Sequence, residues 1–182
     1  MKDVNLLRVT GTIFWSQLDD KGTYKILKLG FKLGSGATMF CAINNTSALP
    51  YESTKAGNKV VLTSAFVDTW DKKDGTSETV FKANQSSVAF FPKDKSIADV
   101  NSIVMIGKVI AYEGDWATIE MVGERNPKTD KPAVRKAKVK IGNSYGDLVG
   151  SRIMLEGSVA STEVEGKSKT HIEANYSTIS IL

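Results

Sequence analysis

Residues 81–91 read FKANQSSVAFF, and residues 172–182 read IEANYSTISIL. Both stretches keep an apolar residue, a charge, Ala-Asn, small hydroxyl or amide positions and an apolar close. A repeat of roughly ninety residues is too long for a solenoid unit and has the size of a small domain. The sequence therefore predicts one small fold used twice. Three further matches flank this one in the same order: 5–11 with 101–107, 22–24 with 114–116, and 59–62 with 152–155.

Apolar residues recur at every second position in both copies. Such alternation is typical of strands with one buried face. Leu27, Leu29 and Phe31 should point inward, and Lys28 and Lys32 outward. By the same parity, a buried row is expected at Val60, Leu62, Ser64 and Phe66, matched by Ile153, Leu155, Gly157 and Val159. Phe81 is also expected in the core.

Each copy gives about five strands, with a short insert after the third. Pro50 and Gly57 allow at most a short helix in that insert. The sequence thus predicts an all-β chain of two tandem five-stranded OB-fold barrels with little helix. The Pro-led polar stretch that begins at Pro92 divides them. We expect a first OB-fold domain at 1–92, a linker at 93–100 and a second OB-fold domain at 101–182.

The composition excludes several classes of protein. A hydrophobic fraction of 41% and a charged fraction of 24% indicate a folded chain rather than a disordered one. The sequence has no apolar run that could span a bilayer and no signal peptide. Cys41 is the single cysteine, which excludes an internal disulfide and favours a reducing, cytoplasmic setting.

His171 is the single histidine, so neither a zinc site nor a Ser-His-Asp set is expected. The sequence Gly34-Ser35-Gly36 lacks the Lys-Ser/Thr of a phosphate-binding loop. We therefore expect no enzyme, no metal and no cofactor. The net charge is +4, and residues 125–140 hold seven basic residues against one acid. This stretch suits either a polyanion partner or a solvated charged hairpin.

Residues 57–91 resemble the latter half of bacterial-type single-stranded DNA-binding proteins. The matching features are GNKVVL at 57–62, an arm that reaches WDKKDG at 70–75, FKAN at 81–84 and the close VAFF at 88–91. The resemblance covers most of each repeat, and it implies OB-fold barrels, single-stranded DNA as partner and a homo-oligomer. Two features differ from the family. The sequence stops inside an expected strand at residues 181–182 without the family's acidic C-terminal tail, and the link between the third and fourth strands is short.

A non-specific binder of single strands needs outward aromatic rings beside cations. Trp70 on the arm, beside Lys72 and Lys73, is the leading candidate, because the family often places a stacking aromatic there. Outward parity adds a second set with Lys28 and Lys32: Tyr24, Phe40, Phe14 and Trp116, together with Trp15 next to Phe14. The alternative for these aromatics is packing at a barrel end, under a loop or between domains.

Lys136, Lys138 and Lys140 alternate on one face of the third strand of the second copy, opposite Ala137, Val139 and Ile141. They form either a stripe that tracks phosphates or the protective lysines of an edge strand. The second arm, at 161–167, carries two acids and no aromatic, so the first domain should dominate stacking.

We therefore predict a protein that coats and protects single-stranded DNA, with little sequence preference, during replication, recombination or repair. The expected setting is the nucleoid or, for a viral protein, the host cytoplasm, with replication or recombination proteins as further partners. Three rivals remain open. They are a tandem-barrel interaction or virion module with an apolar patch around Phe14, Trp15 and Phe40, an RNA-binding adaptor, and a nuclease using Asp68, Asp71 and Asp74.

Overall fold

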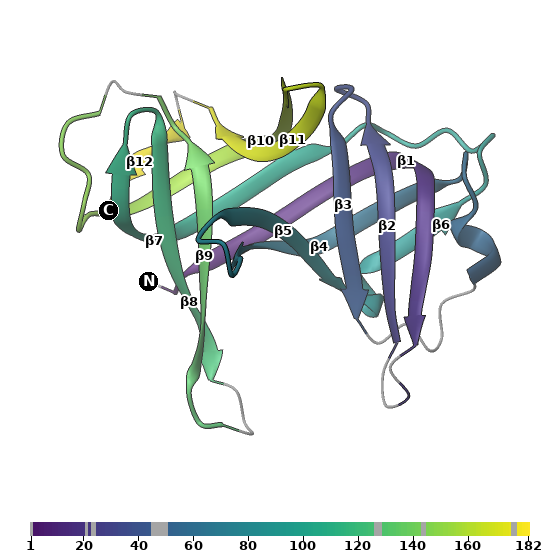
Figure 1. Ribbon diagram of the computed structural model, residues 1–182, viewed down its shortest axis with the longest axis horizontal. Helices are drawn as coiled ribbons and strands as arrows, with labels where there is room; N and C mark the ends of the chain where they lie inside the picture. The colour runs from purple at the N-terminus through teal and green to yellow at the C-terminus, as the bar shows by residue number, and fades with distance from the viewer. Residues whose placement is uncertain are drawn as a thin grey trace.

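The computed structural model describes residues 2–20, 22, 25–44, 51–125, 129–142, 145–175 and 178–182. Over these residues the chain is almost entirely β-structure, as Figure 1 shows. The first half forms β1 (Val4–Asp20), β2 (Lys25–Leu33), β3 (Thr38–Asn44), β4 (Lys59–Asp71), β5 (Ser77–Asn84) and β6 (Val88–Phe91).

The second half repeats this order of strands. It forms β7 (Asn101–Glu113), β8 (Trp116–Arg125), β9 (Pro132–Lys140), β10 (Arg152–Val164), β11 (Lys167–Ala174) and β12 (Ser180–Ile181). Helix in the described residues is limited to 3-10 turns, at η2 (Tyr51–Thr54), at η3 (Gln85–Ser87) and at Thr178.

Each half closes a ring of five strands. In the first, β1 pairs with both β2 and β4, while β3 pairs in parallel with β5. In the second, β7 pairs with β8 and β10, while β9 pairs in parallel with β11. Closure removes the open edges that a flat sheet would present. The predicted class, two tandem five-stranded OB-fold barrels, is confirmed, and β6 and β12 each add a short sixth strand on the outside.

Alternating apolar residues fill both barrels. Leu27, Leu29 and Phe31 are at most 1% exposed, and Phe81 is 3% exposed, as their parity predicted. Cys41 is buried among them, which raises the pKa of its thiol to about 12. A neutral thiol is therefore a packing group of this core.

The predicted parity of β4 is wrong beyond Leu62. A register shift against β1 lies between Leu7 and Val9, and it leaves Thr63 and Ser64 both exposed. The extra residue of this bulge turns every later side chain of the strand to the other face. As a result Ala65 and Val67 enter the core, and Phe66 is half-buried on the outside.

The two barrels share one continuous sheet. The start of β1 pairs antiparallel with the start of β7, and Leu7 lies opposite Ile103. The Asn5 side chain bonds both backbone groups of Val67, with its Nδ2 2.6 Å from the carbonyl oxygen and its Oδ1 3.0 Å from the amide nitrogen. Asn101 makes the same two bonds to Val159, each at 2.8 Å. The joint is therefore nearly two-fold symmetric within a single chain.

The long hairpin of each barrel reaches the other barrel. Thr69 Oγ1 on β4 donates a 3.0 Å hydrogen bond to the carbonyl oxygen of Lys136 on β9. In the opposite direction, Thr170 Oγ1 on β11 donates a 2.7 Å bond to the carbonyl oxygen of Thr38 on β3. In Figure 1 the β4–β5 hairpin accordingly crosses the middle of the molecule beside β9. We call this hairpin the first arm.

The connection between β3 and β4 contains η2, the short helix that Pro50 and Gly57 allowed. Residues 45–50 of this connection lie outside the described part. Among the described residues there is no helix long and apolar enough to cross a membrane.

Candidate nucleic-acid interface

Three aromatic rings gather on the outer face of the first barrel. Phe14, Trp15 and Phe40 are 47%, 39% and 54% exposed. The Phe40 ring lies 5.7 Å from that of Phe14 and 6.0 Å from that of Trp15, measured between centroids, in edge-to-face arrangements. We call these three residues the aromatic cluster. The structure thus brings together aromatics that the sequence placed on separate strands.

A β-bulge explains how two consecutive residues share this face. The register of β1 against β2 shifts between Ile13 and Trp15, so Phe14 is the extra residue. Without the bulge, Phe14 and Trp15 would point to opposite faces of the strand. With it, both are exposed while Ile13 stays in the core.

Gly30 forms the floor beneath the aromatic cluster. It pairs with Trp15 on one side and with Phe40 on the other. A Cβ at Gly30 would lie 2.8 Å from a Phe40 ring carbon and 2.9 Å from a Phe14 ring carbon. The missing side chain therefore lets both rings rest on the backbone of β2. Gly30 was not among the predicted site residues, although a glycine within a strand pattern marks a close approach.

Lys28 and Lys32 flank Gly30 on the outer face of β2, and both are exposed. Lys28 forms an ion pair with Asp19, with 2.6 Å between Nζ and Oδ2. Tyr24, predicted on the same strand, lies outside the described residues. The cluster is thus bordered by cations, as binding of a polyanion requires.

Trp70 lies near the end of β4 on the first arm and is 59% exposed. It pairs with Glu78 of β5. Lys72 binds Glu78 at 2.9 Å, which raises the pKa of the lysine through the hydrogen bond and the charge of Glu78. Lys73 is exposed beside the turn. The arm thus presents a free ring with cations at its tip.

The register connects this ring with the aromatic cluster. Cys41 pairs with Phe81, so Phe40 and Val80 are neighbours on the outer face, and Val80 pairs with Asp68. Trp70 follows Asp68 by two residues on the same face of β4. Neighbouring strands lie about 4.8 Å apart, so only roughly 10 Å of sheet separates β3 from β4. One continuous outer surface carries all four aromatics.

The second barrel has a different surface at the corresponding place. Trp116 pairs with Lys140, and Lys138 Nζ lies 5.6 Å from the centroid of the Trp116 ring. His171 packs edge-on against the same ring at 5.4 Å between centroids, and its Nε2 is buried without a hydrogen-bond partner. The ring of Trp116 is half-buried and already contacted by both groups, so it offers less free face than Trp70.

The alternation predicted for the basic strand is confirmed. Ala137 and Val139 are fully buried and Ile141 is 3% exposed, while Lys136 and Lys138 face solvent. Lys140 Nζ binds Glu173 at 3.2 Å. Arg135 on the same strand places its guanidinium 4.1 Å from the centroid of the Phe66 ring. Sequence reasoning missed this contact because the bulge that turns Phe66 outward was not visible in the pattern.

The predicted equivalence of 22–24 with 114–116 is wrong. Thr12 pairs with Lys32, and its counterpart Lys108 pairs with Glu120. Five residues further along β1 and β7, Gln17 pairs with Lys28 and Glu113 pairs with Trp116. Trp116 therefore occupies the position of Lys28, and the two halves carry different chemistry there.

The three acids weighed for a nuclease have other partners. Asp68 binds Lys82 at 3.2 Å, Asp71 accepts a hydrogen bond from Ser77 at 2.7 Å, and Asp74 accepts one from Thr76 at 2.6 Å. Over the described part of the chain, no group of three or more His, Cys, Asp or Glu residues is arranged to hold a metal ion.

Two OB-fold barrels in one continuous sheet define a tandem OB-fold protein. Its fold is that of the wild-type single-stranded DNA-binding protein from Thermus aquaticus, with a TM-score of 0.67 and 12% identity, covering 100% of this chain and 94% of that one. A deletion mutant of that protein gives a TM-score of 0.64 and 11% identity, covering 100% and 95%. The resemblance inferred from residues 57–91 is therefore confirmed at the level of fold.

Neither a scan against protein-family models nor a search of curated proteins gives a match. A fold by itself does not fix a function, which depends on the side chains that the surface of the barrels presents.

Proposed function

We propose that this chain binds single-stranded DNA with little sequence preference and coats it stoichiometrically during replication, recombination or repair. One observation carries the proposal. Four exposed aromatic rings, Phe14, Trp15, Phe40 and Trp70, lie with lysines on one outer surface of an OB-fold barrel. The solved structures that share the fold include a protein described as single-stranded DNA-binding.

The surface favours single strands for a physical reason. In a duplex the faces of the bases are already stacked on one another, whereas a single strand can lay them on aromatic rings. Stacking gives about 1–3 kcal/mol per base and tolerates any base, because every base has a π-face. Aromatic rings and lysines carry little of the hydrogen-bonding pattern that distinguishes one base from another. Binding should therefore depend on strandedness more than on sequence.

The second barrel contributes mainly charge. Lys136 and Lys138 are exposed on β9, and the first arm contacts the backbone of Lys136 through Thr69. A strand that leaves Trp70 thus meets lysines of the second barrel directly. A homo-oligomer and contacts with replication or recombination proteins also belong to this proposal.

The test is a fluorescence-anisotropy titration of labelled oligo-dT, with matched duplex DNA and RNA as competitors. Trp70→Ala should weaken binding by about five-fold or more, the lower end of one lost stacking contact. Trp70→Phe should keep most of the affinity, because it keeps a ring. Tyr51→Ala is the matched control, since Tyr51 is an aromatic residue 49% exposed on η2 and is not one of the four rings.

A second function is supported by the same rings. An exposed apolar patch is also what a protein-interaction module would present. That reading predicts no affinity for oligo-dT at low salt, and such a result would overturn the DNA-binding proposal. Tighter binding of the matched RNA would instead favour an RNA-binding adaptor.

A further inference from the structure

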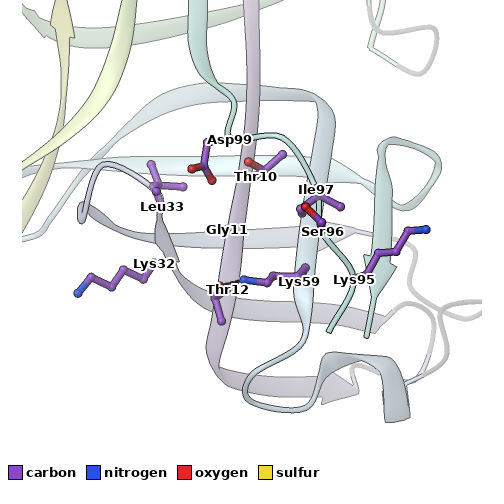
Figure 2. Close-up of a pocket in the computed structure, with 11 residues that line it drawn as sticks. Thr10, Gly11, Thr12, Lys32, Leu33, Lys59, Lys95, Ser96, Ile97 and Asp99 are labelled. Carbon is purple, nitrogen blue, oxygen red and sulfur yellow. Dashed lines mark hydrogen bonds between the residues drawn. The ribbon is translucent and has the colours of Figure 1, made fainter. Parts of the chain in front are cut away.

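A cavity of about 420 Å³ lies on the outer face of the first barrel, between the strands and the segment that connects the two barrels. Its lining includes three lysines from separate parts of the chain: Lys32 at the end of β2, Lys59 at the start of β4 and Lys95 beyond β6. Figure 2 shows these residues around the central strand β1. None of them except Lys32 was predicted to contact a ligand.

The register explains why these lysines meet. Thr12 on β1 pairs with Lys32 on one side and with Lys59 on the other, so the three residues form a row across three strands. Lys59 Nζ donates a 2.9 Å hydrogen bond to Thr12 Oγ1. In Figure 2 the Lys59 side chain accordingly reaches toward Thr12, while Lys32 and Lys95 extend to either side. The barrel thus forms a polar floor with cations at its rim.

The connecting segment forms the opposite wall and is fixed in place. Thr10 Oγ1 donates to the carbonyl oxygen of Ala98 at 3.0 Å and accepts from the amide of Val100 at 2.9 Å. The amide of Thr10 also donates to the carbonyl oxygen of Val100 at 2.8 Å. The wall carries Lys95 and is held by a residue of β1 that is 4% exposed. The connecting segment is therefore attached to the barrel through Thr10 of β1.

The charge of the cavity is unbalanced. Over the described residues, none of its three lysines forms an ion pair with a carboxylate. Asp99 is the acid in the lining, and it packs against Gly34. Figure 2 places Asp99 beside Thr10, away from Lys59 and Lys95. A lysine ammonium is a compact charge on a flexible stem, well suited to meet a phosphate.

The cavity adjoins the aromatic cluster. Thr12 precedes Phe14 by two residues on β1, and Lys32 follows Gly30 by two residues on β2. Two residues of a strand span about 7 Å. A nucleic-acid strand whose bases stack on the cluster therefore has its backbone within reach of these lysines.

We propose that this cavity binds a backbone phosphate of single-stranded DNA through Lys59 and Lys95, with Lys32 at its edge. The inference rests on the proposed function and adds to it a phosphate position formed partly by the segment between the barrels. Strand binding would then involve that connecting segment directly. A free phosphate has the same chemistry, and the experiment below distinguishes the two.

The inference is tested by the salt dependence of oligo-dT affinity, which counts the phosphates that the protein neutralises. For single strands, each neutralised phosphate contributes about −0.7 to the slope of log affinity against log salt. Removing one contact should therefore reduce the loss of affinity between 50 and 200 mM salt by roughly 2.5-fold. Lys59→Ala and Lys95→Ala should each make the slope less steep by about 0.7. Lys59→Arg should keep the slope of the unaltered protein. Lys93→Ala is the control, because Lys93 is exposed on the same segment and does not line the cavity.

Four outcomes are distinct. A lower slope in both alanine variants, with Lys93→Ala unchanged and the same folded circular-dichroism spectrum, supports the inference. Slopes equal to that of Lys93→Ala overturn the cavity while the proposed function stands. No oligo-dT binding by the unaltered protein overturns both. Binding of inorganic phosphate at millimolar concentration, lost in Lys59→Ala while the oligo-dT slope of that variant is unchanged, would assign the cavity to free phosphate and overturn the inference.

Discussion

Gly30 shows how a single residue shapes the outer surface of the first barrel. Its backbone carries the rings of Phe14 and Phe40, and a Cβ there would lie within 3.0 Å of both. The corresponding position in the second barrel is Thr118, opposite Ala111. The second barrel therefore has a threonine side chain at the position where the first has a glycine that two aromatic rings contact.

Gly30→Ala should weaken oligo-dT binding by about five-fold, since the rings must move by a few tenths of an ångström or tilt. This corresponds to roughly 1 kcal/mol, the lower end of one stacking contact. Anisotropy titration measures it, with Thr118→Ala as the control at the equivalent position. Unchanged affinity in Gly30→Ala would show that the arrangement of the cluster does not matter for binding.

Cys41 makes stability depend on pH at the alkaline end. Burial raises the pKa of its thiol to about 12 from the ordinary value of 9.0. Between these two values the folded chain holds a proton that the unfolded chain has lost, so stability falls as pH rises. Cys41→Ala removes this contribution, at the cost of a constant offset from lost packing.

The free energy of unfolding in urea should therefore fall more steeply in the unaltered protein than in Cys41→Ala between pH 9 and 10.5. The expected difference is about 1.4 kcal/mol per pH unit, the equivalent of one proton. Parallel curves would contradict the raised pKa of the thiol. Slow reaction of the folded protein with a thiol reagent at pH 8 would agree with it.

At the scale of the element, matched asparagines join β1 to β4 in the first barrel and β7 to β10 in the second. Asn5 and Asn101 each bond both backbone groups of a valine on the neighbouring strand. Each alanine substitution should cost about 1–3 kcal/mol, because it leaves part-buried backbone groups unsatisfied. Urea unfolding measures both variants. Asn84→Ala is the control, since Asn84 is exposed and makes no side-chain cap bond; a cost as small as that of the control would contradict the role.

The first arm is held to the second barrel by the contact of Arg135 with Phe66. A cation above a ring is worth about 0.5–2 kcal/mol, depending on exposure. A double-mutant cycle with Phe66→Leu and Arg135→Met should give a coupling free energy in that range by urea unfolding. A coupling near zero would mean that Thr69 and Lys136 alone position the arm.

At the scale of the whole molecule, the pairing of β1 with β7 makes one sheet of two barrels. A fragment ending at residue 95 would leave the start of β1 unpaired, an exposed edge. Because Leu7 and Ile103 lie opposite each other, two such fragments can pair in the same antiparallel way. Light scattering after size-exclusion chromatography should find a dimer.

The control for that dimer is Leu6→Arg in the same fragment. Leu6 pairs with Val104, whose counterpart in the first copy is Arg8. The substitution would therefore place two arginines opposite each other, and like charges across a strand pair are destabilising. A monomeric unaltered fragment would contradict the prediction. The division into 1–92, 93–100 and 101–182 stays a prediction that such fragments can test.

The sequence by itself determined the strands, the duplication and the class of fold. Alternation decides which face of a strand is buried, and this is local information, as Phe31 in the core and Lys138 outside show. Phe14 and Phe40 were predicted on the outer face for the same reason, whereas Trp70 was predicted from its place on the arm and Trp15 from its place beside Phe14.

Only the tertiary structure decided which of these residues meet. The bulges at Phe14 and after Leu62 break the alternation by one residue, and their position depends on the pairing partner. The contact of Arg135 with Phe66 and the lysine cavity arise from segments far apart in the chain. Periodicity describes one strand at a time, whereas register and closure are properties of the whole sheet.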